Sequence, residues 1–251
     1  MSFCEHCVKG VTWHEGTPQG KWEKIGGVDT YVATPTVEYA KDKAILFLPD
    51  ALGPQHINNR LLADDFAANG FKTYVPDYLN GDPIPPDALN PGQLFDIMKR
   101  WFPTHTQEFT RPPLDAVIAA LKAAGVTSLG ATGYCFGAGR YVFDLAFENI
   151  IKVGVVSHPS LFKTPDDLAK YVAQSTAPLL INSCTNDAQF PLEASAQADA
   201  LFAGFAPGYK RAHFEGLAHG FAVRGDLSKP AEKAGKEGAF RFAIEWFVAR
   251  L

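Results

Sequence analysis

The sequence predicts a single α/β domain built on a doubly wound, mostly parallel sheet. From residue 44 onward, strand-like and helix-like segments alternate, which is the pattern of right-handed β-α-β crossovers. The strand-like segments include continuous apolar runs such as residues 44–48, as expected for strands covered on both faces. The chain has 251 residues, with neither an internal repeat nor an interdomain linker. One core can serve this length, so residues 1–251 are expected to form one domain.

The composition of the chain argues against nucleic-acid-binding and membrane-spanning proteins. The net charge is -4, with 47% hydrophobic and 20% charged residues, and no cluster of Lys and Arg suggests nucleic-acid binding. No apolar run is long enough to cross a bilayer, and the first residues lack the pattern of a secretory signal. We therefore expect a cytoplasmic enzyme with neither nucleic-acid nor membrane partners.

The N-terminal residues 1–24 are expected to form a surface arm. They contain Cys4 and Cys7 in a C-x-x-C pair, which raises the alternatives of a zinc site or redox chemistry. Zinc needs four ligands, and His6 and His14 do not have the usual spacing. A redox pair would follow a strand of a β-α-β unit rather than stand at the terminus. The arm interpretation is therefore favoured, without a metal.

The remaining elements follow from apolar periodicity. An amphipathic helix is predicted over residues 58–69, with Gly70 as its stop signal. Strands are predicted at residues 28–35, 44–48, 71–77, 127–132, 152–157, 178–184 and 209–214. Further helices are predicted at residues 114–124, 140–149, 164–174, 192–202 and 237–250.

Residues 81–113 interrupt this rhythm with seven prolines around a short helical candidate at residues 91–102. The segment follows the carboxyl end of a strand, where open α/β sheets bind ligands. A lid or substrate wall is therefore favoured over a plain surface loop. Its aromatic residues Trp101, Phe102 and Phe109 would give the wall an apolar character, and Trp101 is a candidate substrate contact.

Gly133-Tyr134-Cys135-Phe136-Gly137 lies between a predicted strand and a predicted helix. Gly-x-nucleophile-x-Gly in this context is the signature of a nucleophile elbow, a tight turn that needs small flanking residues and presents its central side chain to a site. Serine usually occupies the centre, whereas this chain has Cys135.

Three more polar residues follow predicted strands: Asp50, Asp187 and His219. The carboxyl ends of parallel strands share one edge of the sheet, so these side chains are expected to gather near Cys135. The order of nucleophile, acid and histidine is that of the α/β-hydrolases. A histidine can take the proton of a thiol, and a carboxylate can orient the ring. Cys135, His219 and Asp187 fit these three roles.

The chain resembles the dienelactone hydrolase family, the branch of α/β-hydrolases with a cysteine nucleophile. The matching motifs occur in the family's order: Pro49-Asp50-Ala51-Leu52-Gly53, Val75-Pro76-Asp77, Gly133 to Gly137, Asn186-Asp187-Ala188-Gln189-Phe190-Pro191 and Ala218-His219-Gly220-Phe221. The resemblance implies hydrolysis of a small-molecule lactone or activated carboxylic ester through an acyl-cysteine, without a cofactor. The N–H groups of Phe136 and Ala51 would stabilise the oxyanion. A monomer or a homodimer is expected.

Two positions depart from the family pattern. Asp50 stands where family members typically carry a glutamate that contacts the resting cysteine. It either modulates the nucleophile or only shapes its loop. Arg224 lies one residue beyond the family's substrate-binding arginine, and Arg100 and Arg111 are candidate partners in binding an anionic substrate. The resemblance therefore leaves open whether the substrate carries a carboxylate.

Two further functions compete with the hydrolase. The same fold can serve as a catalytically weak binding or scaffold protein, because fold does not fix function. A scaffold has no need of Cys135, Asp187 and His219 together, which favours the enzyme. A redox protein using Cys4 and Cys7 is the other alternative.

Overall fold

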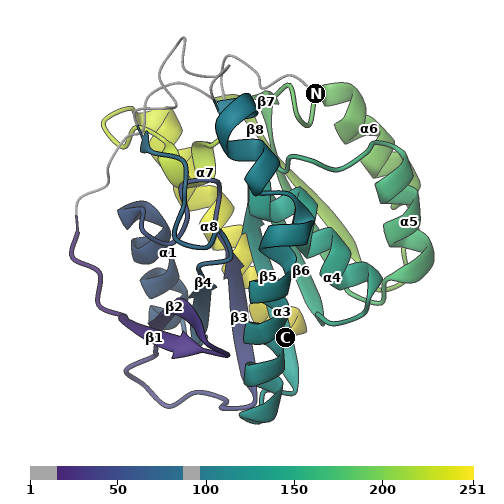
Figure 1. Cartoon of the computed structure of the whole chain (residues 1–251). Helices are drawn as coiled ribbons and strands as arrows, with labels where there is room; N and C mark the ends of the chain where they lie inside the picture. Colours follow the sequence, from purple (N-terminus) through teal and green to yellow (C-terminus); the bar gives the residue numbers. More distant parts are fainter. Residues whose placement is uncertain (1–15, 87–96) are drawn as a thin grey trace.

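The computed structural model describes residues 16–86 and 97–251. In this part of the chain an eight-stranded sheet runs in the order β1-β2-β4-β3-β5-β6-β7-β8 (Figure 1). Its strands are β1 (Lys21–Ile25), β2 (Val28–Ala33), β3 (Lys43–Leu48), β4 (Thr73–Pro76), β5 (Ser128–Tyr134), β6 (Val153–Ser157), β7 (Leu179–Asn186) and β8 (Tyr209–Ala218). Only the β1–β2 and β2–β4 pairs of this sheet are antiparallel. The predicted single domain with a mostly parallel sheet is confirmed.

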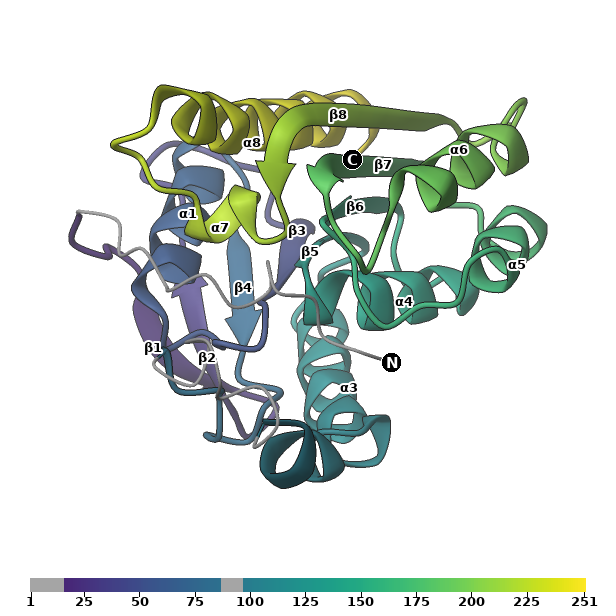
Figure 2. The ribbon, with the colours of Figure 1, turned by 90° about the horizontal axis from the view of Figure 1, so that it is seen from above.

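Helices cover both faces of the sheet, as Figure 2 shows from above. One face carries α1 (Ile57–Ala68) and α8 (Pro230–Arg250). The other face carries α3 (Gln107–Ala123), α4 (Phe143–Phe147), α5 (Asp166–Gln174) and α6 (Leu192–Leu201). A short helix, α7 (Phe221–Arg224), follows the last strand. Among the described residues, no helix has the length and apolarity needed to span a membrane.

Each face of the sheet has its own apolar core, because successive side chains of a strand point to opposite faces. In β3, Ile45 and Phe47 join the core under α1 and α8, whereas Leu46 and Leu48 join the core under α3 to α6. All four side chains are fully buried. This double burial explains why β3 reads as a continuous apolar run, and it anchors the strand end that leads to Asp50.

The predicted arm at residues 1–24 contains a strand that the sequence analysis missed. Residues 1–15, with Cys4 and Cys7, lie outside the described residues. Strand β1 begins at Lys21 and pairs with β2 along its whole length. Its residues are exposed or half-buried, so they show no apolar alternation. Backbone pairing at the sheet edge, rather than side-chain burial, makes this segment a strand.

The proline-rich segment is shorter than predicted, because α3 begins at Gln107 rather than at residue 114. Pro112 and Pro113 lie inside this helix, where each lacks the N–H that would bond to the carbonyl four residues earlier. The side-chain amide of Asn80 donates to the carbonyl of Phe109 at 3.0 Å, which is the acceptor that Pro113 leaves unused. Before α3, the described part of the helical candidate at residues 91–102 contains a π-helical turn, η3 (Ile97–Trp101), and the start of a 3-10 turn, η4 (Phe102–Thr104). Residues 87–96 lie outside the described residues.

The closing helix α8 begins at Pro230, seven residues before the predicted start. Proline is favourable at the first position of a helix. Gly235 lies in the part of α8 that was not predicted, and a Cβ on it would lie 2.0 Å from Leu217 Cδ1. The glycine therefore allows close packing of α8 on β8, and β8 carries His219 at its end.

Candidate active site

The predicted polar residues stand at neighbouring strand ends. Asp50 follows β3, Cys135 follows β5, Asp187 follows β7 and His219 follows β8. Strands β3 and β5 are adjacent and parallel, as are β7 and β8, with β6 between the two pairs. All four side chains are therefore delivered to the same edge of the sheet, where all four residues are at most 9% exposed.

The turn at Cys135 has the strain of a nucleophile elbow. Cys135 adopts a φ of 49°, in the left-handed region that only glycine occupies without cost. A Cβ on Gly133 would lie 2.6 Å from Ala138 Cα, and one on Gly137 would lie 2.4 Å from the carbonyl oxygen of Leu48. Only glycine fits at both positions, which explains the Gly-x-Cys-x-Gly spacing.

His219 and Asp187 form a buried hydrogen-bonded pair. Nδ1 of His219 lies 2.9 Å from Oδ2 of Asp187, and the other carboxylate oxygen accepts the N–H groups of Gln189 and Phe190 at 2.9 and 3.2 Å. Burial opposes ionisation of Asp187, but His219 and the two N–H groups lower its pKa overall. The carboxylate is thus held charged and fixes which ring nitrogen of His219 faces Cys135.

Ser160 lies between the thiol and the imidazole, and the sequence analysis did not identify it. Its Oγ is 3.5 Å from Cys135 Sγ and 3.5 Å from His219 Nε2. Ser160 follows β6, the strand between the one that leads to Cys135 and the one that leads to Asp187. No motif marks it, because its position depends on the turn after β6 rather than on a residue pattern.

Charge coupling favours a thiolate–imidazolium pair. Burial alone would raise the pKa of Cys135, but the charge and hydrogen bond of His219 lower it overall. Burial likewise opposes the imidazolium, yet Asp187 and the Cys135 thiolate raise the pKa of His219 to about 10. The two groups therefore stabilise each other's charged forms, which favours a thiolate next to a proton donor.

Asp50 contacts an arginine and an asparagine. Its Oδ1 accepts the N–H of Leu52 at 3.2 Å and the side-chain amide of Asn59 at 3.1 Å, while Oδ2 lies 3.5 Å from Nε of Arg224. Among the described residues, no hydrogen bond joins Asp50 to Cys135. Asp50 nevertheless acts on Cys135 through its charge, which opposes the thiolate.

The two N–H groups expected to bind an oxyanion belong to Ala51 and Phe136. Ala51 directly follows Asp50, and Phe136 directly follows Cys135 at the start of a helical segment. In the described part of the chain, neither N–H donates to a backbone carbonyl. Phe136 is also held by its ring, which stacks with Tyr78 at a centroid distance of 6.2 Å.

Trp101 reaches the elbow through Phe136. The indole N–H donates to the carbonyl of Asp82 at 2.6 Å, and the ring stacks on His105 with centroids 3.9 Å apart. Its edge packs against Phe136 at 5.6 Å. Trp101 is buried, so it forms the back of an apolar wall rather than an exposed surface.

The two candidate arginines of the proline-rich segment do not gather at this site. Arg111 is bound on the surface by Glu148 and Asp115, with closest distances of 2.7 Å to each. Arg100 is exposed. The third candidate, Arg224, does reach the site, where its Nε lies near the Asp50 carboxylate.

His158 lies behind the catalytic candidates. It is fully buried, with its ring centroid 4.9 Å from that of His219 in an edge-on contact. Burial, together with the nearby charges of His219 and Arg224, lowers its pKa well below the ordinary value. His158 is therefore a neutral packing partner of the His219 ring.

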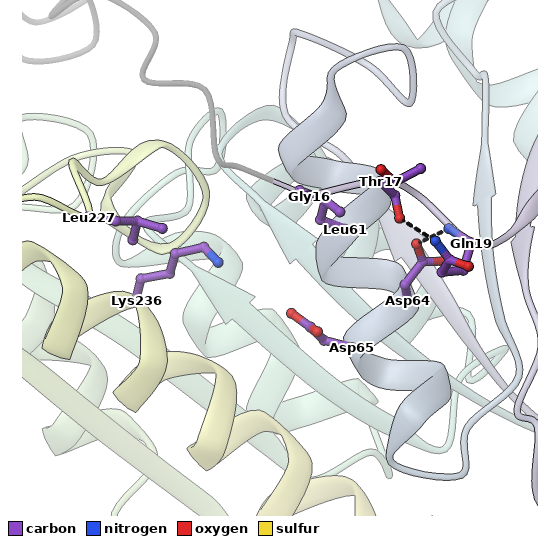
Figure 3. A pocket seen from close by; sticks show the side chains of 8 residues that line it. All are labelled: Gly16, Thr17, Gln19, Leu61, Asp64, Asp65, Leu227 and Lys236. Carbon is purple, nitrogen blue, oxygen red and sulfur yellow. Dashed lines mark hydrogen bonds between the residues drawn. The ribbon is translucent and has the colours of Figure 1, made fainter.

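A separate cavity of about 310 Å³ lies beside α1, at a distance from the elbow (Figure 3). Its lining includes Asp64, Asp65 and Lys236, with Asp65 and Lys236 directed toward one another from α1 and α8. Asp64 accepts the N–H groups of Gln19 and Gly20, which fastens the chain before β1 to α1. Neither Cys135 nor His219 lines this cavity, and it belongs to the packing of the N-terminal segment.

The parallel sheet, the strained elbow and the histidine–carboxylate pair on later strand ends define the class of α/β-hydrolases. The sequence model of the dienelactone hydrolase family matches residues 28–251. The chain belongs to the dienelactone hydrolase family. It is a hydrolase of carboxylic esters or lactones.

Relatives and solved structures agree with this assignment. The chain is 35% identical over 242 residues to hydrolase pyvD of Aspergillus violaceofuscus, covering 96% of this chain and 94% of the relative. It is 32% identical to dienlactone hydrolase 1 of Gibberella moniliformis, covering 96% and 91%. The crystal structure of a putative dienelactone hydrolase from Klebsiella pneumoniae superposes with a TM-score of 0.70 at 19% identity, covering 92% and 97%. That structure supports the fold.

Proposed function

We propose that this enzyme hydrolyses a lactone or a small activated carboxylic ester through an acyl-cysteine intermediate on Cys135. The observation that carries the proposal is the line of contacts from Asp187 through His219 to the sulfur of Cys135. Each member comes from a different strand end, and the charge of His219, which Asp187 supports, lowers the pKa of the Cys135 thiol. Asp187 holds the ring, His219 moves protons, and Cys135 forms the covalent bond.

Acylation begins when the Cys135 thiolate attacks the substrate carbonyl carbon. The carbonyl oxygen becomes an oxyanion, which the N–H groups of Phe136 and Ala51 would bind. In support, neither N–H donates to a backbone carbonyl in the described part of the chain. When the carbonyl re-forms, the C–O bond to the leaving group breaks, and that oxygen takes the proton from His219 Nε2. In a lactone the released hydroxyl stays attached to the acyl group.

Deacylation uses water and the now neutral His219. The His219 ring takes a proton from the water, and the water oxygen attacks the thioester carbon. The C–S bond then breaks, which returns the thiolate of Cys135 and the imidazolium of His219. The product is a carboxylic acid, and no cofactor takes part in these steps.

We further propose that the substrate carries a carboxylate that binds near Arg224. The support is local: Arg224 is nearly buried, and its Nε lies 3.5 Å from the Asp50 carboxylate that follows β3. A substrate anion would take over part of this ion pair, which would leave the charge of Asp50 less compensated by Arg224. The names dienlactone hydrolase 1 and carboxymethylenebutenolidase homolog, carried by relatives, are consistent with such a substrate. The apolar wall of Phe136 and Trp101 would receive the hydrocarbon part.

The test is whether Cys135 becomes acylated during turnover. Cys135→Ala should abolish hydrolysis of p-nitrophenyl acetate beyond the background rate. In His219→Ala, deacylation should be slow enough for the acetyl group to accumulate. Mass spectrometry of the peptide that contains Cys135 should then detect it. Full activity of Cys135→Ala would contradict the acyl-cysteine mechanism, because hydrolysis would then proceed without the sulfur.

A further inference from the structure

The turn after β6 is strained on both sides of Ser160. His158 has a φ of 39° and Leu161 a φ of 66°, so two residues with a Cβ occupy the left-handed region within four positions. Such a conformation is strained for a residue with a Cβ and persists only where the surroundings impose it. The strain indicates that the position of Ser160 is enforced by its neighbours.

Backbone contacts fix Ser160 to the elbow. Its N–H donates to the carbonyl of Cys135 at 3.1 Å, and the N–H of Cys135 donates to the carbonyl of Ser157 at 3.2 Å. The carbonyl oxygen of Ser160 lies so close to Gly139 that an added Cβ there would be 2.0 Å away. The turn after β6 and the elbow therefore form one unit, and Ser160 Oγ has a set position relative to Cys135 Sγ.

This rigid placement puts a hydroxyl between the two reactive groups. Ser160 is 6% exposed, and its Oγ is equally distant from Cys135 Sγ and His219 Nε2, at 3.5 Å. A hydroxyl has one proton to donate and lone pairs to accept with, whereas a thiolate only accepts and an imidazolium only donates. Beside the hydrogen bond between His219 and the sulfur, the hydroxyl can therefore accept from Nε2–H and donate its own proton to the sulfur.

We propose that Ser160 is a positioning residue whose hydroxyl bridges the Cys135 thiolate and the His219 imidazolium in the free enzyme. The proposal deepens the proposed function, and it rests on Cys135 and His219 being the reacting pair. The bridge donates a charge-assisted hydrogen bond to the sulfur and holds the imidazole proton toward the site where the leaving group will stand. No proton is transferred to Ser160, and no bond to it forms.

Other charged and titratable groups also act on the thiol, so the test must isolate the hydroxyl. Besides His219, these groups are Arg224 on α7, Asp50 after β3 and the buried phenol of Tyr78. Ser160→Ala leaves all of them in place and removes one oxygen atom.

The measurement is the rate of Cys135 alkylation by iodoacetamide against pH, read by mass spectrometry of the peptide that contains Cys135. The chain has other cysteines, so a peptide-specific readout is necessary. Hydrogen bonds to charged groups are worth roughly one to two pKa units. The alkylation profile of Ser160→Ala should therefore move upward by about one unit, and Ser160→Thr, which keeps a hydroxyl, should return toward wild type.

Ser157→Ala is the matched control. Ser157 is buried in the same strand end, but its Oγ accepts the amide of Asn182 at 3.0 Å. Its removal should leave the alkylation profile unchanged. An unchanged profile in Ser160→Ala, or an equal shift in Ser157→Ala, would overturn the proposal.

Steady-state kinetics give a second readout. For Ser160→Ala, kcat/KM should be about tenfold lower at acid pH and should converge with wild type at alkaline pH, where the thiolate forms without the bridge. An equal loss at every pH would indicate general damage and contradict the bridge. The alkylation experiment needs no turnover, so it remains decisive for Ser160 even if Cys135→Ala retained esterase activity and the proposed function failed.

Discussion

The carboxylate of Asp50 and the guanidinium of Arg224 face each other at 3.5 Å, from the end of β3 and from α7. Both side chains are withdrawn from solvent, at 2% and 8% exposure. Burying such a pair costs desolvation energy. Replacing one partner leaves the other charge buried without compensation, which lowers the free energy of unfolding. Both charges of the pair act on Cys135: Arg224 lowers the pKa of the thiol, and Asp50 raises it.

Arg224→Gln should distinguish anionic from neutral substrates. For an ester that carries a carboxylate, KM should rise by roughly tenfold to a hundredfold, because a charge-assisted hydrogen bond of about 1.5–3 kcal/mol is lost. For p-nitrophenyl acetate, KM should change little. Arg211→Gln, at an arginine bound on the surface by Asp199, serves as the control. Equal effects on both substrates would contradict a role in carboxylate binding.

Asp187→Asn should lower kcat by roughly 10³–10⁴-fold, the loss known for the equivalent change in a serine protease triad. An amide can present its NH₂ to His219 and so stabilise the wrong tautomer, although the shape of the side chain is preserved. The measurement is kcat for p-nitrophenyl acetate together with the melting temperature. Asp199→Asn, on the surface, should keep its activity. A loss of less than tenfold in Asp187→Asn would show that another carboxylate orients the ring.

The pH dependence of kcat/KM should show a wide plateau. As pH falls through the lowered pKa of Cys135, the thiolate is protonated and activity is lost. As pH rises through the raised pKa of His219, at about 10, the ring loses the proton that it gives to the leaving group, and activity falls again. In His219→Ala burial is no longer offset by the imidazolium, so the thiol should titrate above its ordinary value of about 8.5. A wild-type profile that rises only near that value would show that no ion pair exists.

Gly139→Ala should destabilise the fold and disturb Ser160. The new Cβ would meet the Ser160 carbonyl at 2.0 Å, and neither backbone can withdraw without breaking the elbow contacts. Overpacking of this kind costs about 1–3 kcal/mol. Gly154→Ala is the matched comparison, since its Cβ would meet side-chain atoms rather than backbone, the nearest being the Tyr171 hydroxyl at 3.1 Å. Chemical denaturation should show a clearly larger loss in the free energy of unfolding for Gly139→Ala.

The parallel strands and most helices could be predicted from the sequence because burial on both faces leaves continuous apolar runs, as in β3. Elements that do not depend on apolar burial could not be predicted in this way. The edge strand β1 buries almost nothing, so its pairing leaves no apolar pattern. The start of α3 was missed because Pro112 and Pro113 read as helix breakers, whereas Asn80 supplies the hydrogen bond that Pro113 lacks.

The positions of Cys135, Asp187 and His219 at strand ends could be predicted because motif and topology agree. The contacts that tune them could not. Ser160 has no motif, and it reaches the sulfur only through two left-handed residues in its turn. The contact of Asp50 with Arg224 depends on the turn at Gly220, where α7 begins and the arginine folds back over the glycine.

The strand ends that meet at the elbow are far apart along the chain, and His219 follows the last strand, β8. During synthesis, Cys135 leaves the ribosome long before the residue that lowers the pKa of its thiol. Until β8 pairs with β7, His219 is not held beside that sulfur and does not lower the pKa of its thiol. The reactivity of Cys135 is therefore a late product of folding, and its alkylation rate at neutral pH would report when a nascent chain has completed its sheet.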